Sequence, residues 1–259
     1  MRLALIAGQG QLPAALAARI AQAPLVCALQ GFMPAKLAVD LVFRLETLGS
    51  FVQQLQQRGI THLCMCGAIR RPTIDPAAID DATLPLVPVL QQALAAGDDG
   101  ALRAVIGLFQ DSGITVLGAH QLAPDLLMPA GCPTRAQPSA AQRADLALAL
   151  QVLDEQGAAD LGQACVIGAG QVWAREGEAG TDAMLAALQG RGQGAVLHKA
   201  PKPGQDLRAD LPTIGPDTVA AAAAAGLSGI ALQAGAVMVL DQDQVLASLD
   251  QAGLFLWLR

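Results

Sequence analysis

The stretch Leu3-Ala-Leu-Ile-Ala-Gly-Gln-Gly-Gln-Leu-Pro13 indicates the fold of the first half of the chain. Leu3 to Ala7 is a short apolar run, typical of a buried strand, and the glycines that follow interrupt it. Pro13 is favoured in the first turn of a helix, where its missing N–H is not needed. The stretch therefore predicts a strand, a glycine-rich loop and a helix.

The same alternation of strand and helix signals continues through the first half of the chain. Further strands are predicted at 25–29, 62–66 and 115–117, and helices at 13–21, 51–58, 87–95 and 101–111. Such alternation favours a parallel sheet with helices packed on its faces. We therefore expect an α/β protein whose residues 1–133 form a Rossmann-like nucleotide-binding domain.

A proline-rich connector at 129–138 interrupts the pattern, and we expect the domain boundary there. Ser139 and Gln142 form a predicted capping box ahead of a helix with the apolar stripe Leu146, Leu150 and Leu153. A hairpin is predicted around 168–170, helices at 182–188, 216–225 and 242–251, strand-like pieces at 230–232 and 237–240, and a final strand at 254–257. Residues 134–259 are thus expected to form a second, mixed α/β domain.

Composition restricts the class of protein. Hydrophobic residues make up 53% and charged residues 15% of the 259 residues, with a net charge of -6. A chain of this kind is compact, and its acidic balance argues against nucleic-acid binding, which needs a basic face. The five scattered cysteines are typical of reduced thiols in a cytoplasmic protein. The uncharged run at 218–240 contains several glycines, so a membrane span is not expected there.

The glycine-rich loop is the first candidate binding element. Glycines at 8 and 10 allow close backbone approach to a phosphate, and the helix start at Gln11, Leu12 and Pro13 offers N–H groups to it. A dinucleotide fingerprint needs a small residue where Pro13 stands and an acid after the second strand, and neither is present. The loop is therefore either a nucleotide or diphosphate cradle, or a tight turn that a proline converts into a helix.

Two further polar groups lie in the first half. Arg70 and Arg71 follow a predicted strand at its carboxyl end, and this pair is either a phosphate clamp or a solvated surface. Asp98 and Asp99 precede a helix, where they cap it or bind a metal or ribose hydroxyls. For His120, a core or capping role is favoured over a place in a cleft.

The segment 176–217 is unusually polar for this chain. Asp210 lies outside any predicted helix start, before a rigid Leu-Pro pair, and a carboxylate fixed in this way suits Mg²⁺. Lys199 and Lys202, on an extended Ala-Pro-Lys-Pro stretch, are suited to neutralise charge in phosphoryl transfer, or form a solvated loop. Thr181 and Asp182 are shared between a catalytic site and the cap and first turn of a helix.

Several of these groups belong to an ordered set of motifs. The set comprises Ile6-Ala-Gly-Gln-Gly-Gln-Leu-Pro13, Gly67-x-x-x-Arg-Pro72, Gly97-Asp-Asp-Gly-Ala-Leu102, Gly118-Ala-His120, Gly180-Thr-Asp-Ala-Met184, Lys199-Ala-Pro-Lys-Pro203 and Asp210-Leu-Pro-Thr-Ile-Gly215. In this order the motifs resemble the LpxI-type UDP-2,3-diacylglucosamine pyrophosphatases of lipid A biosynthesis, over nearly the whole chain.

The resemblance implies a Mg²⁺-dependent hydrolase that converts UDP-2,3-diacylglucosamine to UMP and 2,3-diacylglucosamine 1-phosphate (lipid X). It implies a homodimer of two-domain subunits, a site between the domains, water attack on the sugar-side phosphorus and apolar walls for the acyl chains. The family's essential aspartate corresponds to Asp210, with Lys199, Lys202, Thr181 and Asp182 as further catalytic candidates. The expected substrate-binding positions are Gly8, Gly10, Gln11, Leu12, Pro13, Arg71, Asp98, Asp99 and Thr213.

Two other expectations accompany this one. A lipid-linked substrate suggests peripheral contact with the cytoplasmic face of the inner membrane. The same nucleotide-binding loop would also suit a non-catalytic nucleotide-sugar-binding regulatory module, which would bind without turnover.

Overall fold

The computed structural model describes residues 1–70, 72–95 and 97–259, and their side chains apart from those of 93–99. The chain divides into two compact units. The first contains Met1–Pro124 together with Asp206–Asp210, and the second contains Asp125–Gln205 and Leu211–Arg259. The predicted α/β class, with a parallel sheet and a separate mixed sheet, is confirmed.

The division lies ahead of the proline-rich connector, at Pro124, and not at residue 133. The connector belongs to the second unit because its backbone pairs there: Gly131 and Leu258 exchange two backbone hydrogen bonds of 2.9 and 2.8 Å. Thr134 Oγ1 also accepts a 2.9 Å bond from the buried amide of Leu256. Prolines mark a break in regular structure, but they do not say with which unit the broken segment packs.

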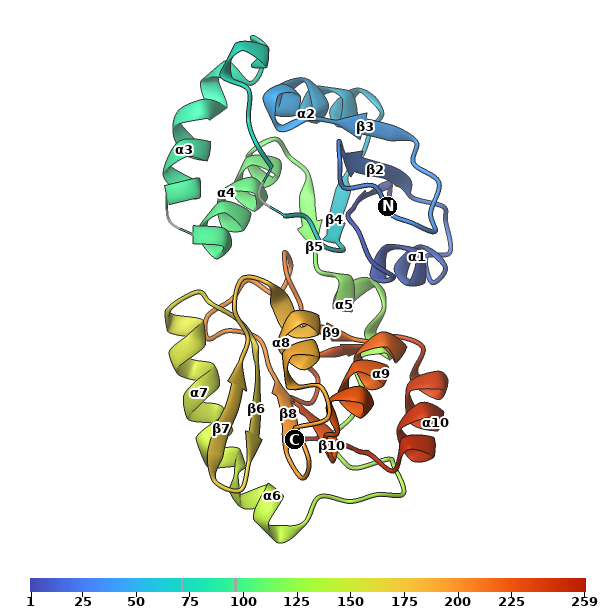
Figure 1. Cartoon of the computed structure of the whole chain (residues 1–259). Helices are drawn as coiled ribbons and strands as arrows, with labels where there is room; N and C mark the ends of the chain where they lie inside the picture. Colours follow the sequence, from blue (N-terminus) through green and yellow to red (C-terminus); the bar gives the residue numbers. More distant parts are fainter. Residues whose placement is uncertain (71, 96) are drawn as a thin grey trace. The chain divides into compact units, whose positions relative to one another are not determined.

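The first unit contains a five-stranded parallel sheet with the strand order β3-β2-β1-β4-β5 (Figure 1). Its strands are β1 Leu3–Ala7, β2 Leu25–Leu29, β3 Leu41–Phe43, β4 His62–Cys66 and β5 Thr115–Leu117. Its α-helices are α1 Leu12–Ala17, α2 Leu48–Gln57, α3 Val87–Ala95, α4 Gly97–Asp111 and α5 Ala119–Leu122, with short 3-10 turns at Leu45–Thr47, Pro76–Ala78 and Leu84–Leu86. The strand order reverses direction between β1 and β4, which is where open α/β sheets place ligands.

Burial explains why these strands form. Every residue of β1 is buried, as expected for a central parallel strand covered on both faces. On one face Phe43 stacks on Phe51 of α2 with ring centroids 4.0 Å apart, and Phe109 of α4 meets Phe51 edge-on at 6.3 Å. The short edge strand β3 was not predicted, because only three residues form it and one of them, Val42, is half exposed.

The second unit contains a mixed sheet with the strand order β12-β10-β8-β6-β7. Its strands are β6 Ala164–Gly168, β7 Gln171–Arg175, β8 Val196–Lys199, β10 Gly229–Leu232 and β12 Phe255–Leu258, and a separate pair is formed by β9 Thr213–Ile214 and β11 Met238–Val239. Strands β8, β10 and β12 are parallel, whereas β6 runs antiparallel to β7 and β8. The central strand β8, which ends at Lys199, was not predicted.

Helices cover both faces of this sheet (Figure 1). The helices of this unit are α6 Ala140–Ala144, α7 Leu146–Ala158, α8 Gly180–Leu188, α9 Pro216–Ala225 and α10 Gln242–Ala252, and a 3-10 turn is present at Pro124–Leu126. Helices α8, α9 and α10 pack on one face, and α7 packs on the other. Within the described residues, no helix is long and apolar enough to cross a membrane.

Local signals of the second half are mostly confirmed. Ser139 and Gln142 make the reciprocal bonds of a capping box, at 2.9 and 3.3 Å. The predicted hairpin joins β6 to β7, and Ala169 and Gly170 both have positive φ, as a two-residue hairpin turn requires. The predicted apolar stripe is wrong in one member: Leu150 is 40% exposed, because α7 turns Ala149, Val152 and Leu153 toward the sheet.

Candidate active site

Two loops meet at the carboxyl ends of β1 and β4. The amide of Gly8 donates to the carbonyl of Cys66 at 2.8 Å, and Gln9 and Ala68 exchange two backbone bonds of 2.9 Å. A β-carbon on Gly8 would lie 2.6 Å from the carbonyl oxygen of Ala68. Glycine at this position is therefore required by contact between the two loops, and the amides of Gly8 and Gln9 are already used.

Beyond this contact the loop is open at Gly10. Gly10 has a φ of 95°, and nothing lies within 4 Å of the position of a β-carbon there. The chain then passes through Gln11 into α1, where Pro13 is buried near the helix start. The first glycine of the motif thus serves packing, and the proline opens the helix; the interpretation as a phosphate cradle stays a prediction.

The segment Asp206–Asp210 lies against the first unit, although it is distant in sequence. Ala209 packs on the apolar core of that unit. The carbonyl oxygen of Leu207 lies 3.1 Å from the place of a β-carbon on Gly118, directly after β5. Because all strands of this sheet are parallel, the segment carrying Asp210 is on the same edge as the loops after β1 and β4.

An ion pair within the segment gives it a defined shape. Arg208 donates to both carboxylate oxygens of Asp206, at 2.9 and 2.6 Å, and this bidentate bond holds the pKa of Asp206 below its ordinary value. The positive charge of Arg103 on α4 adds a smaller effect in the same direction. The amide of Asp210 approaches the carbonyl of Asp206 at 3.4 Å, so Asp210 follows directly from this turn.

For a metal ion, the described residues offer single carboxylates and not a cluster of ligands. Within the described part of the chain, no three or more His, Cys, Asp or Glu side chains gather as a metal site. Mg²⁺ is usually held by one or two carboxylates, with waters and substrate phosphates completing its shell. A single carboxylate such as Asp210 fits that arrangement, whereas a cage of protein ligands does not fit the described residues.

His120 lies beside the same segment, in the short helix after β5. A β-carbon on Gly118 would lie 2.5 Å from His120 Cε1, so the imidazole packs directly on this glycine. Burial lowers the pKa of His120, and among the described residues its Nδ1 has no hydrogen-bond partner. The cap of α5 comes instead from Gln121, whose side chain accepts from the Gly118 amide at 2.8 Å.

In the second unit, three polar side chains from different elements meet below the surface. Lys199, the last residue of β8, donates from Nζ to Thr181 Oγ1 at 2.9 Å. The Thr181 hydroxyl donates in turn to Glu176 Oε1 at 2.5 Å. Each of the three residues is only 8% exposed. The structure therefore brings together Lys199 and Thr181, and adds Glu176, which was seen only as part of a polar segment.

Thr181 is not the cap of its helix. The N-cap of α8 is Ala179, which makes no side-chain capping bond, and Thr181 lies inside the first turn with its hydroxyl turned inward. Asp182 is exposed in the same turn, where a carboxylate interacts favourably with the helix amino end. Thr181 is thus buried and hydrogen-bonded, whereas its neighbour Asp182 is exposed.

Lys202 differs from Lys199 in its partners. Its Nζ lies 2.5 Å from Asp160 Oδ1 in an ion pair, and its amide donates to Gln205 Oε1 at 2.9 Å. Its side chain is 16% exposed. Any contact with a phosphate would therefore compete with Asp160.

The remaining predicted site residues are spread over both units. Arg71 and the side chains of Asp98 and Asp99 lie outside the described residues, although the backbone of both aspartates is in the first turn of α4. Thr213, in β9 of the second unit, donates from its hydroxyl to the carbonyl of Leu211 at 3.1 Å.

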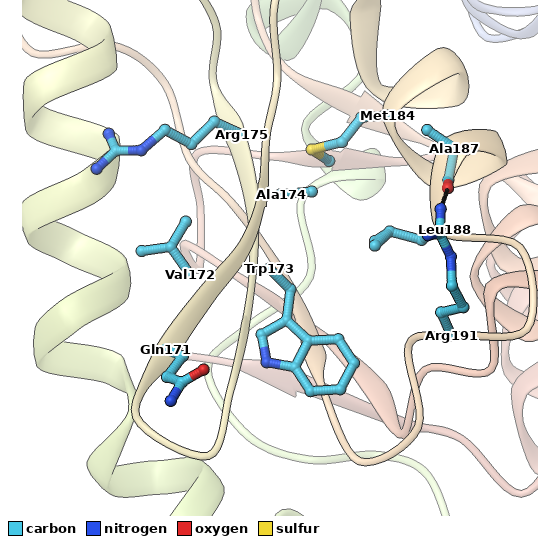
Figure 2. A pocket seen from close by; sticks show the side chains of 9 residues that line it. All are labelled: Gln171, Val172, Trp173, Ala174, Arg175, Met184, Ala187, Leu188 and Arg191. Atoms are coloured by element: carbon cyan, nitrogen blue, oxygen red, sulfur yellow. Dashed lines mark hydrogen bonds between the residues drawn. The ribbon is translucent and has the colours of Figure 1, made fainter.

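A shallow hollow of about 610 Å³, lined by polar as well as apolar side chains, lies between β7 and α8 of the second unit (Figure 2). Trp173, Met184 and Leu188 contribute apolar side chains to its lining, and Gln171, Arg175 and Arg191 contribute polar ones. The β6–β7 register is irregular at Trp173, whose indole N–H donates to the carbonyl of Gly168 at 2.9 Å and whose ring stays 38% exposed. Of these residues only Met184 belongs to a motif noted in the sequence, and a tryptophan in a strand usually indicates core.

Comparison with known proteins gives a consistent result over both units. Models of the LpxI N-terminal domain and the LpxI C-terminal domain match residues 2–126 and 129–257. The UDP-2,3-diacylglucosamine pyrophosphatase LpxI of Caulobacter vibrioides is 37% identical over 270 residues, which cover 98% of this chain and 96% of that relative. The two matched ranges are separated close to Pro124, where the compact units divide.

Proposed function

Because this chain belongs to the LpxI family, we propose that it hydrolyses the diphosphate bond of UDP-2,3-diacylglucosamine in lipid A biosynthesis. The products are UMP and 2,3-diacylglucosamine 1-phosphate (lipid X), and the reaction depends on Mg²⁺. The observation that carries the proposal is the position of Asp210. Its segment belongs to the first unit and lies on the sheet edge where the glycine-rich loop also ends, which is the edge where open α/β sheets bind ligands.

The first unit supplies the nucleotide-binding part of this proposal. The start of α1 lies at the proposed ligand-binding edge of the sheet and is formed by Gly10, Gln11, Leu12 and the buried Pro13. The contact that Gly8 makes with the loop after β4 holds this segment in place. Helix starts of this kind favour phosphate groups. Arg71, Asp98, Asp99 and Thr213 are further proposed substrate contacts.

Asp210 is the proposed catalytic and metal-binding carboxylate. When bound, Mg²⁺ would supply neutralisation of phosphate charge and lower the cost of forming hydroxide from water. In the proposed reaction a water oxygen bonds to the sugar-side phosphorus, and UMP leaves with the bridging oxygen. Asp210 would orient this water or accept its proton, which is the task of a general base.

Lysines of the second unit are the proposed phosphate partners. Lys199 is fixed at the end of β8 by Thr181, and a preorganised cation of this kind stabilises charge that develops in the transition state. Lys202 would act only after exchanging Asp160 for a phosphate. Asp182, exposed beside Thr181, is the weakest member of the set on structural grounds, since its position in the first turn of α8 already explains it.

The acyl chains of the substrate need an apolar surface. The hollow around Trp173, Met184 and Leu188 offers one, and it lies along α8, the helix that also carries Thr181. We further propose that the protein is a homodimer and contacts the cytoplasmic face of the inner membrane while it takes up this lipid. Analytical ultracentrifugation and vesicle sedimentation would test these two points.

A turnover assay separates the enzyme from a binding module that lacks catalysis. Purified protein would be incubated with UDP-2,3-diacylglucosamine in Mg²⁺, in EDTA, and in EDTA followed by excess Mg²⁺, with products identified by mass spectrometry. We expect UMP and lipid X with Mg²⁺, loss of both in EDTA, and recovery on readdition. Saturable binding of the substrate without release of UMP in any condition would favour the regulatory module.

A further inference from the structure

We propose that Glu176 is a positioning residue, which orients the Lys199 ammonium through the hydroxyl of Thr181. The inference rests on the proposed function, because it assumes that Lys199 acts on a diphosphate. Its basis is a continuous chain of two side-chain hydrogen bonds that joins a loop residue to a helix and a strand. Glu176 follows β7, Thr181 lies in α8, and Lys199 ends β8.

The direction of both hydrogen bonds follows from the donor groups available. An ammonium has no lone pair, so Lys199 must donate to Thr181 Oγ1. A hydroxyl has only one proton, and the 2.5 Å contact assigns it to the carboxylate of Glu176. Thr181 therefore cannot donate to a phosphate while this arrangement holds. Its place in the site is to connect two charged groups, and not to bind substrate directly.

Glu176, which ends this series of hydrogen bonds, is itself held at its carboxylate and at its backbone. Glu176 Oε2 accepts the amide of Gln163 at 2.6 Å, while its backbone carbonyl accepts Gln156 Nε2 at 3.1 Å. A β-carbon on Gly162 would lie 2.9 Å from the β-carbon of Glu176, so glycine there permits the close packing. Rotation of the Glu176 side chain would break a backbone hydrogen bond as well as the one from Thr181. The position of Thr181 is thereby defined by the backbone ahead of β6.

Because the cluster of Glu176, Thr181 and Lys199 is buried, stabilisation of the fold does not explain it well. Removing an ammonium and a carboxylate from water has a large cost, and packed apolar side chains of similar volume often stabilise a protein equally well. The three side chains are 8% exposed and lie beside a core of leucine, valine and alanine residues. What the polar arrangement adds is one defined orientation of the ammonium, which a catalytic cation needs.

Steady-state kinetics on the full-length protein with UDP-2,3-diacylglucosamine and Mg²⁺ would test the inference. We expect Glu176→Gln to lower kcat by about tenfold or more with KM changed less than about threefold, because the effect is confined to the transition state. If the amide oxygen of Glu176→Gln accepts from Thr181, its N–H₂ group faces the backbone N–H of Gln163, which is also a donor. One of the two hydrogen bonds of Glu176 is therefore lost in this variant. The matched control is Glu178→Gln, an exposed glutamate two residues away, whose kinetics should stay as in the wild type.

Variants of the connecting threonine make the test specific. Thr181→Val keeps the shape and removes the hydroxyl, so it should lower kcat like Glu176→Gln, whereas Thr181→Ser should restore most of it. The double variant Glu176→Gln with Thr181→Val should be no slower than Thr181→Val, because Glu176 acts only through that hydroxyl. Thermal unfolding would verify that each variant is folded. If Glu176→Gln does not fold, the comparison of Thr181→Val with Thr181→Ser still tests the inference.

The inference is overturned if Glu176→Gln retains the wild-type kcat, or if it raises KM alone. It is also overturned if serine at 181 is as slow as valine, or if the two substitutions lower kcat independently. All of these outcomes require a wild-type protein that hydrolyses the substrate. Failure of the wild type to release UMP would instead contradict the proposed function.

Discussion

The carbonyl oxygen of Leu207 lies 3.1 Å from the point where a β-carbon on Gly118 would be. This contact joins a loop of the second half of the chain to the end of β5 in the first unit. It leaves no room for a side chain, and the imidazole of His120 occupies the other side. The position of the segment carrying Asp210 therefore depends on Gly118, which is distant from it in the sequence.

Gly118→Ala should damage activity and stability together. The added methyl group would lie 2.5 Å from His120 Cε1 and 3.1 Å from Leu207 O, so the His120 ring must move and the backbone at Leu207 must adjust slightly. We expect a loss of about 1 to 3 kcal/mol in the free energy of unfolding, typical of overpacking, and a large fall in kcat. Urea unfolding and turnover would measure the two effects. Gly107→Ala, at an open helical position of α4, should be neutral or stabilising.

Asp210→Asn should abolish most turnover and leave the fold intact. The amide keeps the shape of the side chain but can neither accept a proton nor bind Mg²⁺ well, so kcat should fall by at least about 100-fold. Asp154→Asn, at an exposed site on α7, is the control and should keep normal kinetics. Near-normal turnover in Asp210→Asn, with circular dichroism unchanged, would remove Asp210 from its proposed role.

His198 should make the protein less stable in mild acid. The residue is fully buried in β8, and both ring nitrogens have no hydrogen-bond partner among the described residues. Burial, with a contribution from Arg259, lowers the pKa of His198 to about 3. A histidine in the unfolded chain has a pKa of about 6.5, so below that pH the unfolded state binds more protons than the folded state. The free energy of unfolding therefore falls as the pH drops toward 3.

The corresponding experiment compares the wild type with His198→Leu at pH 7 and pH 5. The contribution of the buried imidazole to this difference should be about 2 kcal/mol, since each pH unit below the unfolded pKa changes the free energy by about 1.4 kcal/mol. Urea unfolding at both pH values should therefore show a smaller pH effect in His198→Leu. An equal pH effect in the two proteins would assign the acid sensitivity to other groups.

Trp173 should report binding of the acyl chains. The protein has only two tryptophans, and Trp173 lines the hollow and is 38% exposed. Burial of its ring by an acyl chain should shift the fluorescence emission to shorter wavelength when lipid X is added. Trp173→Phe removes this probe and keeps an aromatic ring, and the shift should disappear with it. A shift of the same size in Trp173→Phe would assign the signal to Trp257.

Much of the local structure could be predicted from the sequence. Strands β1, β2, β4 and β5 have the predicted bounds, and α9 begins at Pro216 and ends at Ala225 as expected. These elements have strong local signals: continuous apolar runs, or a proline at the start and a glycine after the end of a helix. Strand β8 lacked such a signal, because its residues His198 and Lys199 are polar yet fully or nearly buried.

The sequence by itself determined the alternation of strands and helices and the family, and it singled out a small set of polar groups as candidate site residues. The tertiary structure decided how those groups combine. It assigned Asp210 to the edge of the first sheet and joined Glu176, Thr181 and Lys199 through two hydrogen bonds. It also showed that Gly8 serves a loop contact. The physical reason is that periodicity and capping report interactions within a few residues, whereas strand order and packing bring together residues that are distant in the chain.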